Sequence, residues 1–161
     1  MIVILMGPTG VGKTTVGEIL GRDLGWEFAD ADRFHSPANV EKMSKGIGLT
    51  DTERKPWLEA LRKKIQDWIA AGQSGVLACS ALKKSYREIL SVGPEVKWVY
   101  LKGSLAEIAK RVAERKGHYA KESLVASQFE ALEEPTDALT VDVDQTPEQI
   151  VAEIRKGLGI S

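Results

Sequence analysis

The sequence predicts an α/β fold, a three-layer sandwich in which helices cover both faces of a five-stranded parallel sheet. Short apolar segments alternate with longer segments of helical spacing along all 161 residues, as expected of a parallel sheet with crossover helices. The first apolar segment, residues 2–6 (Ile-Val-Ile-Leu-Met), has no polar residue, which is typical of a strand buried on both faces. No linker-like stretch or internal repeat divides the sequence, so we expect residues 1–161 to form a single domain.

The first segments after this strand are expected to form a helix, a short strand and a second helix. Residues 13–24 carry apolar side chains at helical spacing, and Gly25 is a suitable stop. Residues 26–29 follow as a second short strand. Residues 36–45 begin with Ser-Pro, a cap followed by proline at the first helical position, and are expected to form a short helix.

The middle of the chain continues the alternation. Residues 50–53 (Thr-Asp-Thr-Glu) form a capping box, which opens a long helix whose apolar stripe extends to Gly72. Residues 75–79 are expected to form the third strand. A helical pattern covers residues 82–90, and residues 96–101 form the expected fourth strand.

The last third repeats the order of helix and strand. Residues 104–107 (Ser-Leu-Ala-Glu) form a second capping box and open a helix. The pattern breaks at residues 116–121 and returns as a helix over residues 124–132. Residues 139–143 are the expected fifth strand, and residues 146–149 (Thr-Pro-Glu-Gln) cap the last helix.

Composition excludes several classes of protein. The chain is 43% hydrophobic and 28% charged, with a formal net charge of −1, so no basic field attracts it to nucleic acid or to a membrane surface. No apolar run approaches the length of a membrane span, and we expect no secretory signal. The single cysteine, Cys79, cannot form an internal disulfide, which fits a cytoplasmic location.

Residues 7–14 (Gly-Pro-Thr-Gly-Val-Gly-Lys-Thr) match the phosphate-loop pattern, with a strand before and a helix after them. Glycines let successive N–H groups face an anion, and the helix N-terminus adds positive charge. Lys13 can reach the β- and γ-phosphates, and the Thr14 hydroxyl can bind Mg²⁺. The pattern predicts binding of a nucleoside triphosphate without identifying the acceptor. The candidate nucleotide-binding residues in this stretch are Gly7, Thr9, Gly10, Val11, Gly12, Lys13, Thr14 and Thr15.

Two aspartates, Asp30 and Asp32, follow the second expected strand. One could bind Mg²⁺ through water, and the other could accept the proton of an attacking hydroxyl. The alternative is a pair of turn-forming, helix-capping residues. Beside a phosphate loop we favour the functional interpretation, in which either aspartate could take either role.

Basic residues near the start of the helix at residues 82–90 indicate an anionic ligand. Lys83, Lys84 and Arg87 gather there, with the hydroxyl of Tyr86, against the charge preference of a helix N-terminus. The alternative is a solvated charged surface.

A second basic group, Arg111 and Arg115, precedes the break in helical pattern. Arginines in this position suit a lid, about residues 115–135, that closes over a transferring phosphate. Arg111 is thus a nucleotide-binding candidate and Arg115 a catalytic one, with pairing to neighbouring glutamates as the alternative. His35 and His118 are far apart in sequence, and we expect neither to bind a metal.

With these residues assembled, the chain resembles the gluconate kinases (gluconokinases) of the phosphate-loop kinase superfamily over nearly its whole length. The most specific segment is residues 79–87 (Cys-Ser-Ala-Leu-Lys-Lys-Ser-Tyr-Arg), followed by residues 115–118 (Arg-Lys-Gly-His). The resemblance also rests on residues 30–35, 39–43 with Gly46, Leu49 and Asp51, 54–58, 128–130 and 132–135.

This resemblance implies ATP- and Mg²⁺-dependent phosphorylation of D-gluconate at its terminal hydroxyl, a nucleoside-monophosphate-kinase-like fold and a cytoplasmic homodimer. It implies that Lys13 and Thr14 hold phosphate and metal, and that Asp32 faces the acceptor hydroxyl as the candidate base, which makes Asp30 the candidate metal residue. His35, Arg54, Lys83 and Arg87 are the substrate-binding residues that we expect outside the lid. Within the lid, His118 is the expected substrate-binding residue and Arg115 the expected catalytic one. Residues 142–147 are a candidate for the adenine contact by position only.

Two other interpretations stay open. A related small-molecule kinase such as a shikimate kinase also has paired aspartates after its second strand, although residues 80–87 do not resemble that family. A phosphate-loop regulatory module that binds a protein is the alternative from another class, and the chain lacks a guanine-reading Asn-Lys-x-Asp segment.

Overall fold

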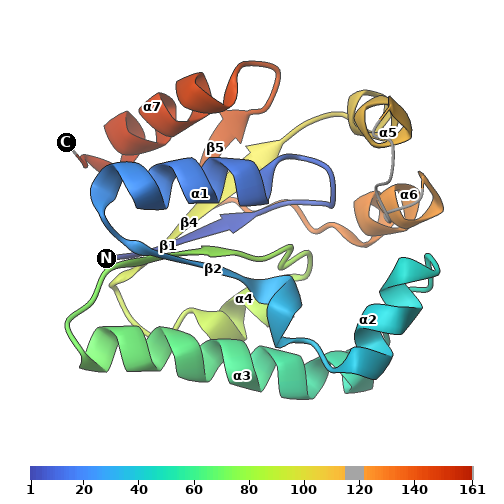
Figure 1. Ribbon diagram of the computed structural model, residues 1–161, viewed down its shortest axis with the longest axis horizontal. Coiled ribbons are helices and arrows are strands. Elements are labelled where there is room, and N and C mark those ends of the chain that lie inside the picture. Colours follow the sequence, from blue (N-terminus) through green and yellow to red (C-terminus); the bar gives the residue numbers. More distant parts are fainter. Residues whose placement is uncertain (115–121, 161) are drawn as a thin grey trace.

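The computed structural model describes residues 1–114 and 122–160, and its centre is a five-stranded parallel sheet in the order β2-β3-β1-β4-β5 (Figure 1). The strands are β1 (Ile2–Met6), β2 (Glu27–Asp30), β3 (Gly75–Ala78), β4 (Val96–Lys102) and β5 (Leu139–Asp142). The helices are α1 (Lys13–Leu24), the 3₁₀ helix η1 (Ala31–Phe34), α2 (Pro37–Ser44), α3 (Asp51–Ala70), α4 (Lys84–Leu90), α5 (Leu105–Glu114), α6 (Glu122–Ala131) and α7 (Pro147–Leu158). The predicted fold class is confirmed.

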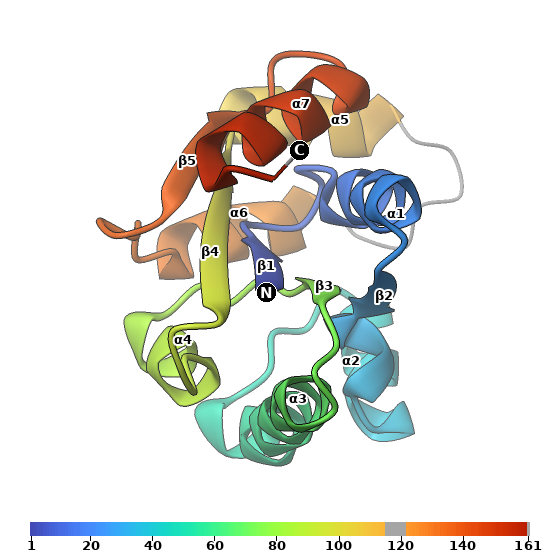
Figure 2. The same cartoon turned by 90° about the vertical axis from the view of Figure 1, so that its left-hand side faces the viewer.

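Helices cover both faces of the sheet, and the alternation of side chains along β1 explains why. Ile2, Ile4 and Met6 enter one apolar cluster with residues of α3 and α4, whereas Val3 and Leu5 enter a second cluster with residues of α1, α5 and α7. Successive residues of a strand point to opposite faces, so a wholly apolar β1 requires cover on both sides. Figure 2 shows α1, α5 and α7 on one side of the sheet and α3 and α4 on the other.

The capping signals begin helices where the sequence predicts them. The Thr50 hydroxyl accepts a hydrogen bond from the Glu53 amide at 3.1 Å, and the Glu53 carboxylate accepts from the Thr50 amide at 2.9 Å. Thr146 and Gln149 make the same reciprocal pair at the start of α7. Each pair satisfies two amides that the first turn of a helix otherwise leaves unpaired.

One helix begins later than predicted. The pattern favours a helix from residue 82, but α4 begins at Lys84 because the chain first makes a tight turn after β3. Ala81 in this turn has a φ of +42° and is fully buried, a left-handed conformation that is uncommon outside glycine. Lys83 is extended and precedes the first helical residue.

The carboxyl ends of the central strands meet at one edge of the sheet. Ala78 at the end of β3 pairs with Leu5 of β1 on one side and with Asp30 of β2 on the other. The loops that follow these strands therefore start side by side, which is where parallel α/β sheets bind ligands. Helices α2 and α6 stand beyond this edge (Figure 1).

Of the segment predicted as a lid, about residues 115–135, the structure describes α6 and the residues after it. Arg115 and His118 lie outside the described residues. Within the described residues, no helix combines the length and apolar character needed to cross a membrane.

Candidate active site

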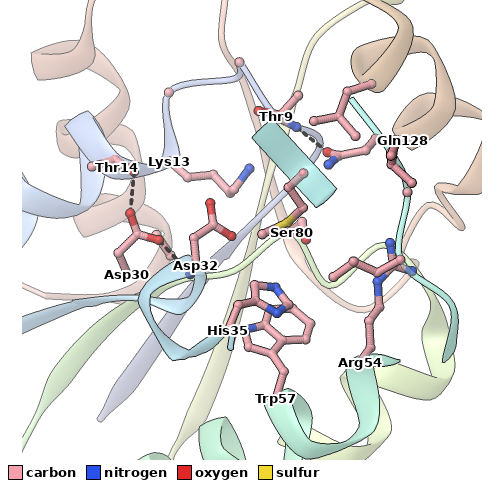
Figure 3. A pocket seen from close by; sticks show the side chains of 18 of the residues that line it. Thr9, Lys13, Thr14, Asp30, Asp32, His35, Arg54, Trp57, Ser80 and Gln128 are labelled. Carbon is pink, nitrogen blue, oxygen red and sulfur yellow. Dashed lines mark hydrogen bonds between the residues drawn. The ribbon is translucent and has the colours of Figure 1, made fainter. Parts of the chain in front are cut away.

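A pocket of about 380 Å³ lies at the carboxyl edge of the sheet (Figure 3). The phosphate loop and the start of α1 form one wall. The opposite wall consists of the last residue of β2, one side of α3 and the connection between α2 and α3. Ser80 and α6 close the remaining sides. Segments far apart in the sequence thus converge on one cavity.

The phosphate loop has a conformation that glycine permits. Gly12 precedes α1 with a φ of +96°. Gly10 has a φ of +89°, and a Cβ atom there would lie 2.8 Å from Val112 and 2.9 Å from Ile108. A side chain at either position would strain the backbone, and one at Gly10 would also collide with α5, so glycine lets the loop lie against that helix.

Lys13 extends back over this loop. Its ammonium donates hydrogen bonds to the carbonyl oxygens of Gly7 at 2.8 Å and Pro8 at 2.9 Å. Burial lowers the pKa of Lys13, and the Asp32 carboxylate opposes that change. Figure 3 shows the Lys13 ammonium and the Asp32 carboxylate on facing sides of the pocket. The Lys13 amine therefore lies where it could contact the phosphate oxygens of a bound nucleotide.

The two aspartates have different surroundings because η1 begins between them, with Asp30 before its first residue and Asp32 within it. Asp30 caps η1 through the Asp32 amide, at 3.0 Å from Asp30 Oδ1, and its other oxygen accepts from the Thr14 hydroxyl at 3.3 Å. The helix-capping alternative is thus correct for Asp30, which also faces the phosphate loop. Asp32 is exposed to the pocket, and partial desolvation by the protein around it raises its pKa, with Lys13 opposing the rise. A raised pKa suits a group that must accept a proton.

The donors near Thr14 fit a magnesium ion. Mg²⁺ prefers oxygen ligands and often takes only one or two from protein, with water and phosphate supplying the rest. Thr14 and Asp30 offer a hydroxyl and a carboxylate next to the phosphate loop. Among residues 1–114 and 122–160, no group of three or more His, Cys, Asp and Glu side chains could hold a metal by itself.

His35 and Trp57 form the floor of the pocket opposite the phosphate loop. Their rings stack with centroids 4.3 Å apart and planes inclined by 12°, and the Trp57 indole donates to the Ala31 carbonyl at 2.7 Å. Burial, with a smaller contribution from the Arg54 charge, lowers the pKa of His35 to about 4. His35 is therefore neutral at physiological pH, and its buried Nδ1 has no hydrogen-bond partner within the described residues.

Arg54 lines the pocket beside this floor. Its Nη1 donates to the Tyr86 hydroxyl at 3.0 Å, and Tyr86 in turn donates to the Asp51 carboxylate. Lys83 lies outside the pocket lining and pairs with Asp51 at 3.0 Å. Of the three cations predicted to bind the substrate outside the lid, Arg54 therefore reaches the pocket, while Lys83 supports the network that holds Arg54.

The structure does not place Arg87, an expected substrate-binding residue, at this pocket. Arg87 is only 8% exposed and does not line this pocket. Its guanidinium donates to the carbonyl oxygens of Ala81 at 2.8 Å, Leu82 at 3.2 Å and Glu133 at 2.7 Å. The basic side chain thus stabilises the tight turn after β3 and the segment that follows α6.

Replacing this side chain should affect stability more than substrate binding. Arg87→Ala leaves three carbonyl groups without their donor, and we expect it to lower the free energy of unfolding by about 2–4 kcal/mol. Urea denaturation measures this loss, and Lys84→Ala, in the exposed neighbouring position, should change stability by less than about 0.5 kcal/mol. A normal unfolding curve together with a tenfold higher KM for the sugar acid would restore the original interpretation.

Arg111 also lies outside this pocket but reaches the segment predicted to contact the nucleobase. Its Nη2 donates to the Val143 carbonyl at 2.8 Å. The structure thus brings together a predicted nucleotide-binding arginine and residues 142–147, which begin at the last residue of β5.

The sequence interpretation missed Gln128 as a site residue. Its side-chain oxygen accepts a hydrogen bond from the Thr9 amide in the phosphate loop at 2.6 Å (Figure 3). Leu124, one turn earlier on α6, lines the same pocket. The only available signal was the place of Gln128 in a segment of family resemblance, which assigned it no role.

Comparison with known proteins places this fold and pocket in a class. A family model described as "Shikimate kinase" matches residues 9–158, which identifies a phosphate-loop kinase.

The "Thermoresistant gluconokinase" of Escherichia coli is 41% identical over 165 residues, covering 97% of this chain and 94% of the relative. The "Gluconokinase" of Gluconobacter oxydans is 41% identical over 157 residues, covering 94% and 88%. The crystal structure of a gluconokinase from Sinorhizobium meliloti has 39% identity and a TM-score of 0.87, covering 98% and 90%. The chain belongs to the gluconokinase family.

Proposed function

We propose that the protein transfers the γ-phosphoryl group of ATP to the terminal hydroxyl of D-gluconate, giving 6-phospho-D-gluconate and ADP. The observation that carries this proposal is one pocket that joins a phosphate loop to a carboxylate and an arginine, in a chain about 40% identical to gluconokinases. Asp32 lies between Lys13 on one side of the pocket and His35 and Arg54 on the other. This position supports transfer of a phosphoryl group from a nucleotide at the phosphate loop to an acceptor beside His35 and Arg54.

The residues of the pocket account for the chemistry. The gluconate oxygen forms a bond to the γ-phosphorus, the bond from that phosphorus to the bridging oxygen of ADP breaks, and the hydroxyl proton passes to Asp32. Lys13 neutralises charge that develops on the phosphate oxygens. When bound near Thr14 and Asp30, Mg²⁺ would supply further neutralisation of phosphate charge.

Acceptor choice follows from the wall opposite the phosphate loop. Of the described residues that line the pocket, Lys13 and Arg54 are the cations, and Lys13 serves the phosphates. Arginine can hold a carboxylate through two parallel hydrogen bonds, so we assign the gluconate carboxylate to Arg54. His35, neutral at physiological pH, would serve the sugar hydroxyls.

The proposal also covers the adenine contact, the lid, the oligomeric state and the location of the protein. Arg111 and residues 142–147 would hold the adenine, which is consistent with their contact. We propose that the chain is a single kinase domain with a lid over about residues 115–135, and that it acts as a cytoplasmic homodimer. The family resemblance supports the dimer, and a buried, unpaired Cys79 suits a reducing compartment.

The test of function is an assay of ADP release across a panel of acceptors. We expect turnover with D-gluconate to exceed that with D-glucose by at least about a hundredfold, because a neutral sugar leaves Arg54 without its partner. Shikimate belongs in the panel because the family model carries that name. Equal turnover of glucose, or preference for shikimate, would overturn the assignment.

A single variant should connect that preference to one side chain. Arg54→Ala should raise the KM for gluconate by about 10- to 100-fold, because a charged hydrogen-bonded pair contributes about 1.5–3 kcal/mol. The KM for ATP should change little, and the gap between gluconate and glucose should narrow. Lys55→Ala removes the adjacent, exposed charge and should leave both constants near the wild-type values.

A further inference from the structure

We propose that Gln128 binds the γ-phosphate of ATP, exchanging its contact with the phosphate loop for one with the nucleotide. The proposal rests on the kinase function proposed above. Three observations support it: the hydrogen bond of Gln128 to the loop, the seating of α6 on the core, and the anchoring of the segment after α6.

The contact with Thr9 places an acceptor oxygen at a phosphate-binding amide. Gln128 Oε1 lies 2.6 Å from the Thr9 amide nitrogen, inside the pocket that also contains Lys13 and Asp32. Amides of a phosphate loop otherwise donate to phosphate oxygens. The Gln128 oxygen therefore occupies the position of such an acceptor, and a phosphate oxygen can receive the Thr9 hydrogen bond only by displacing it.

The contact lies at the γ-phosphate end of the loop. The Lys13 ammonium, which serves the β- and γ-phosphates, lies within 3 Å of the carbonyl oxygens of Gly7 and Pro8, the residues before Thr9. The amides of Gly12 and Thr14 belong instead to the start of α1. Thr9 and Gln128 are therefore close to the transferred group.

Helix α6 is held in place on this loop by its apolar face. Val125 is fully buried, and Phe129 packs against the same apolar cluster as Val11 of the loop. Leu124 lines the pocket one turn before Gln128. Because residues four apart share a helix face, Gln128 is directed at the pocket by side chains already seated.

The segment after α6 is anchored to the turn after β3. The Glu133 amide donates to the Leu82 carbonyl at 2.8 Å, and the Lys84 amide donates to the Glu133 carboxylate at 2.7 Å. Arg87 adds its bond to the Glu133 carbonyl at 2.7 Å. With its end fixed, α6 keeps Gln128 within reach of the phosphate loop.

An amide suits this exchange better than a carboxylate. Glutamine offers one acceptor oxygen and an NH₂ group with two donors at the same point. Without nucleotide the oxygen accepts from Thr9, and once a phosphate oxygen has displaced it the NH₂ group can donate to the γ-phosphate. Glutamate in that position could only accept, and its charge would repel the γ-phosphate.

Calorimetric binding of ADP and of a non-hydrolysable ATP analogue to the full chain tests the proposal without any acceptor. Gln128→Met, similar in size without the amide, should weaken the ATP analogue about tenfold and ADP less than about twofold. Gln128→Glu should weaken the ATP analogue about a hundredfold. Glu130→Gln, an exposed charge change on the same helix, should leave both affinities unchanged.

The pattern of losses decides the outcome. Wild-type affinities in both Gln128 variants, or equal losses for ADP and the ATP analogue, would overturn the proposal, since a merely structural side chain does not distinguish the nucleotides. Thermal unfolding of each variant identifies any loss caused by misfolding, and the isosteric Met and Glu replacements provide two independent readings. Because binding is measured without gluconate, a wrong acceptor assignment cannot produce either result.

Discussion

Lys13→Met is expected to lower kcat/KM for phosphoryl transfer by at least about a thousandfold while the protein stays folded. The ammonium is the cation positioned over the phosphate loop, bonded to the carbonyl oxygens of Gly7 and Pro8. A methionine has a similar length and no charge, so negative charge on the transferring phosphate would lose its neutralising partner. An assay of ADP release with gluconate measures the loss.

The fold should survive this change for a reason visible in the electrostatics. Burial lowers the pKa of Lys13, which means that the folded environment disfavours the charged amine relative to water. Removing that charge relieves a desolvation cost, which offsets the loss of the two hydrogen bonds to the Gly7 and Pro8 carbonyls, and we expect a thermal midpoint close to that of wild type. Lys110→Met, an exposed lysine on α5, is the matched control and should retain full activity. Activity of Lys13→Met within a few-fold of wild type would contradict the assigned role.

The parts of the site that the sequence predicts well are those encoded by neighbouring residues. The phosphate loop is one contiguous motif, and its form depends on local backbone conformation at Gly10 and Gly12. Asp30 and Asp32 follow a strand, and parallel topology brings strand ends to one edge. Chain order alone thus locates these groups near one another.

Side-chain direction explains why Arg87 lies away from the pocket lining. Its position near the start of α4 is compatible with an anionic ligand, and the sequence contains no sign that the preceding turn presents carbonyl oxygens inward. The buried, left-handed Ala81 creates that turn. Carbonyls of Ala81 and Leu82 then take the guanidinium, because a buried arginine needs acceptors wherever the fold supplies them.

Long-range pairing explains the omission of Gln128. The bond to Thr9 joins residues 119 positions apart, and it depends on how α6 is seated over the loop. The network at Arg54 has the same character, since Tyr86 and Asp51 lie on different helices. Neither arrangement leaves a periodic or local signal, so both require the tertiary structure.

Asp32→Asn is expected to lower kcat by about 10²–10⁴-fold, the usual effect of losing a general base. The amide keeps the shape of the side chain but cannot take the proton of the attacking hydroxyl. Nucleotide affinity should change much less, because Asp32 faces the acceptor side of the pocket. Asp30→Asn is the matched control: asparagine can still cap η1, and we expect a shifted dependence on Mg²⁺ concentration rather than a loss of proton transfer.

The raised pKa of Asp32 gives the same variant a distinctive pH signature. Wild-type kcat should rise with pH through the pKa of Asp32, which lies above the ordinary aspartate value of 3.8, and the Asn variant should lack this rise.

The free energy of unfolding of the wild-type protein should change with pH in the opposite direction to kcat. A carboxyl group whose pKa is higher in the folded state than in the unfolded state binds more protons when folded, so the free energy of unfolding falls as pH rises between the two values. Asp32→Asn should therefore unfold at an equal or higher temperature than wild type at pH 7, and the difference should disappear below pH 3.8. If this variant turns over normally and Asp30→Asn loses activity instead, Asp30 is the base and Asp32 belongs to the metal.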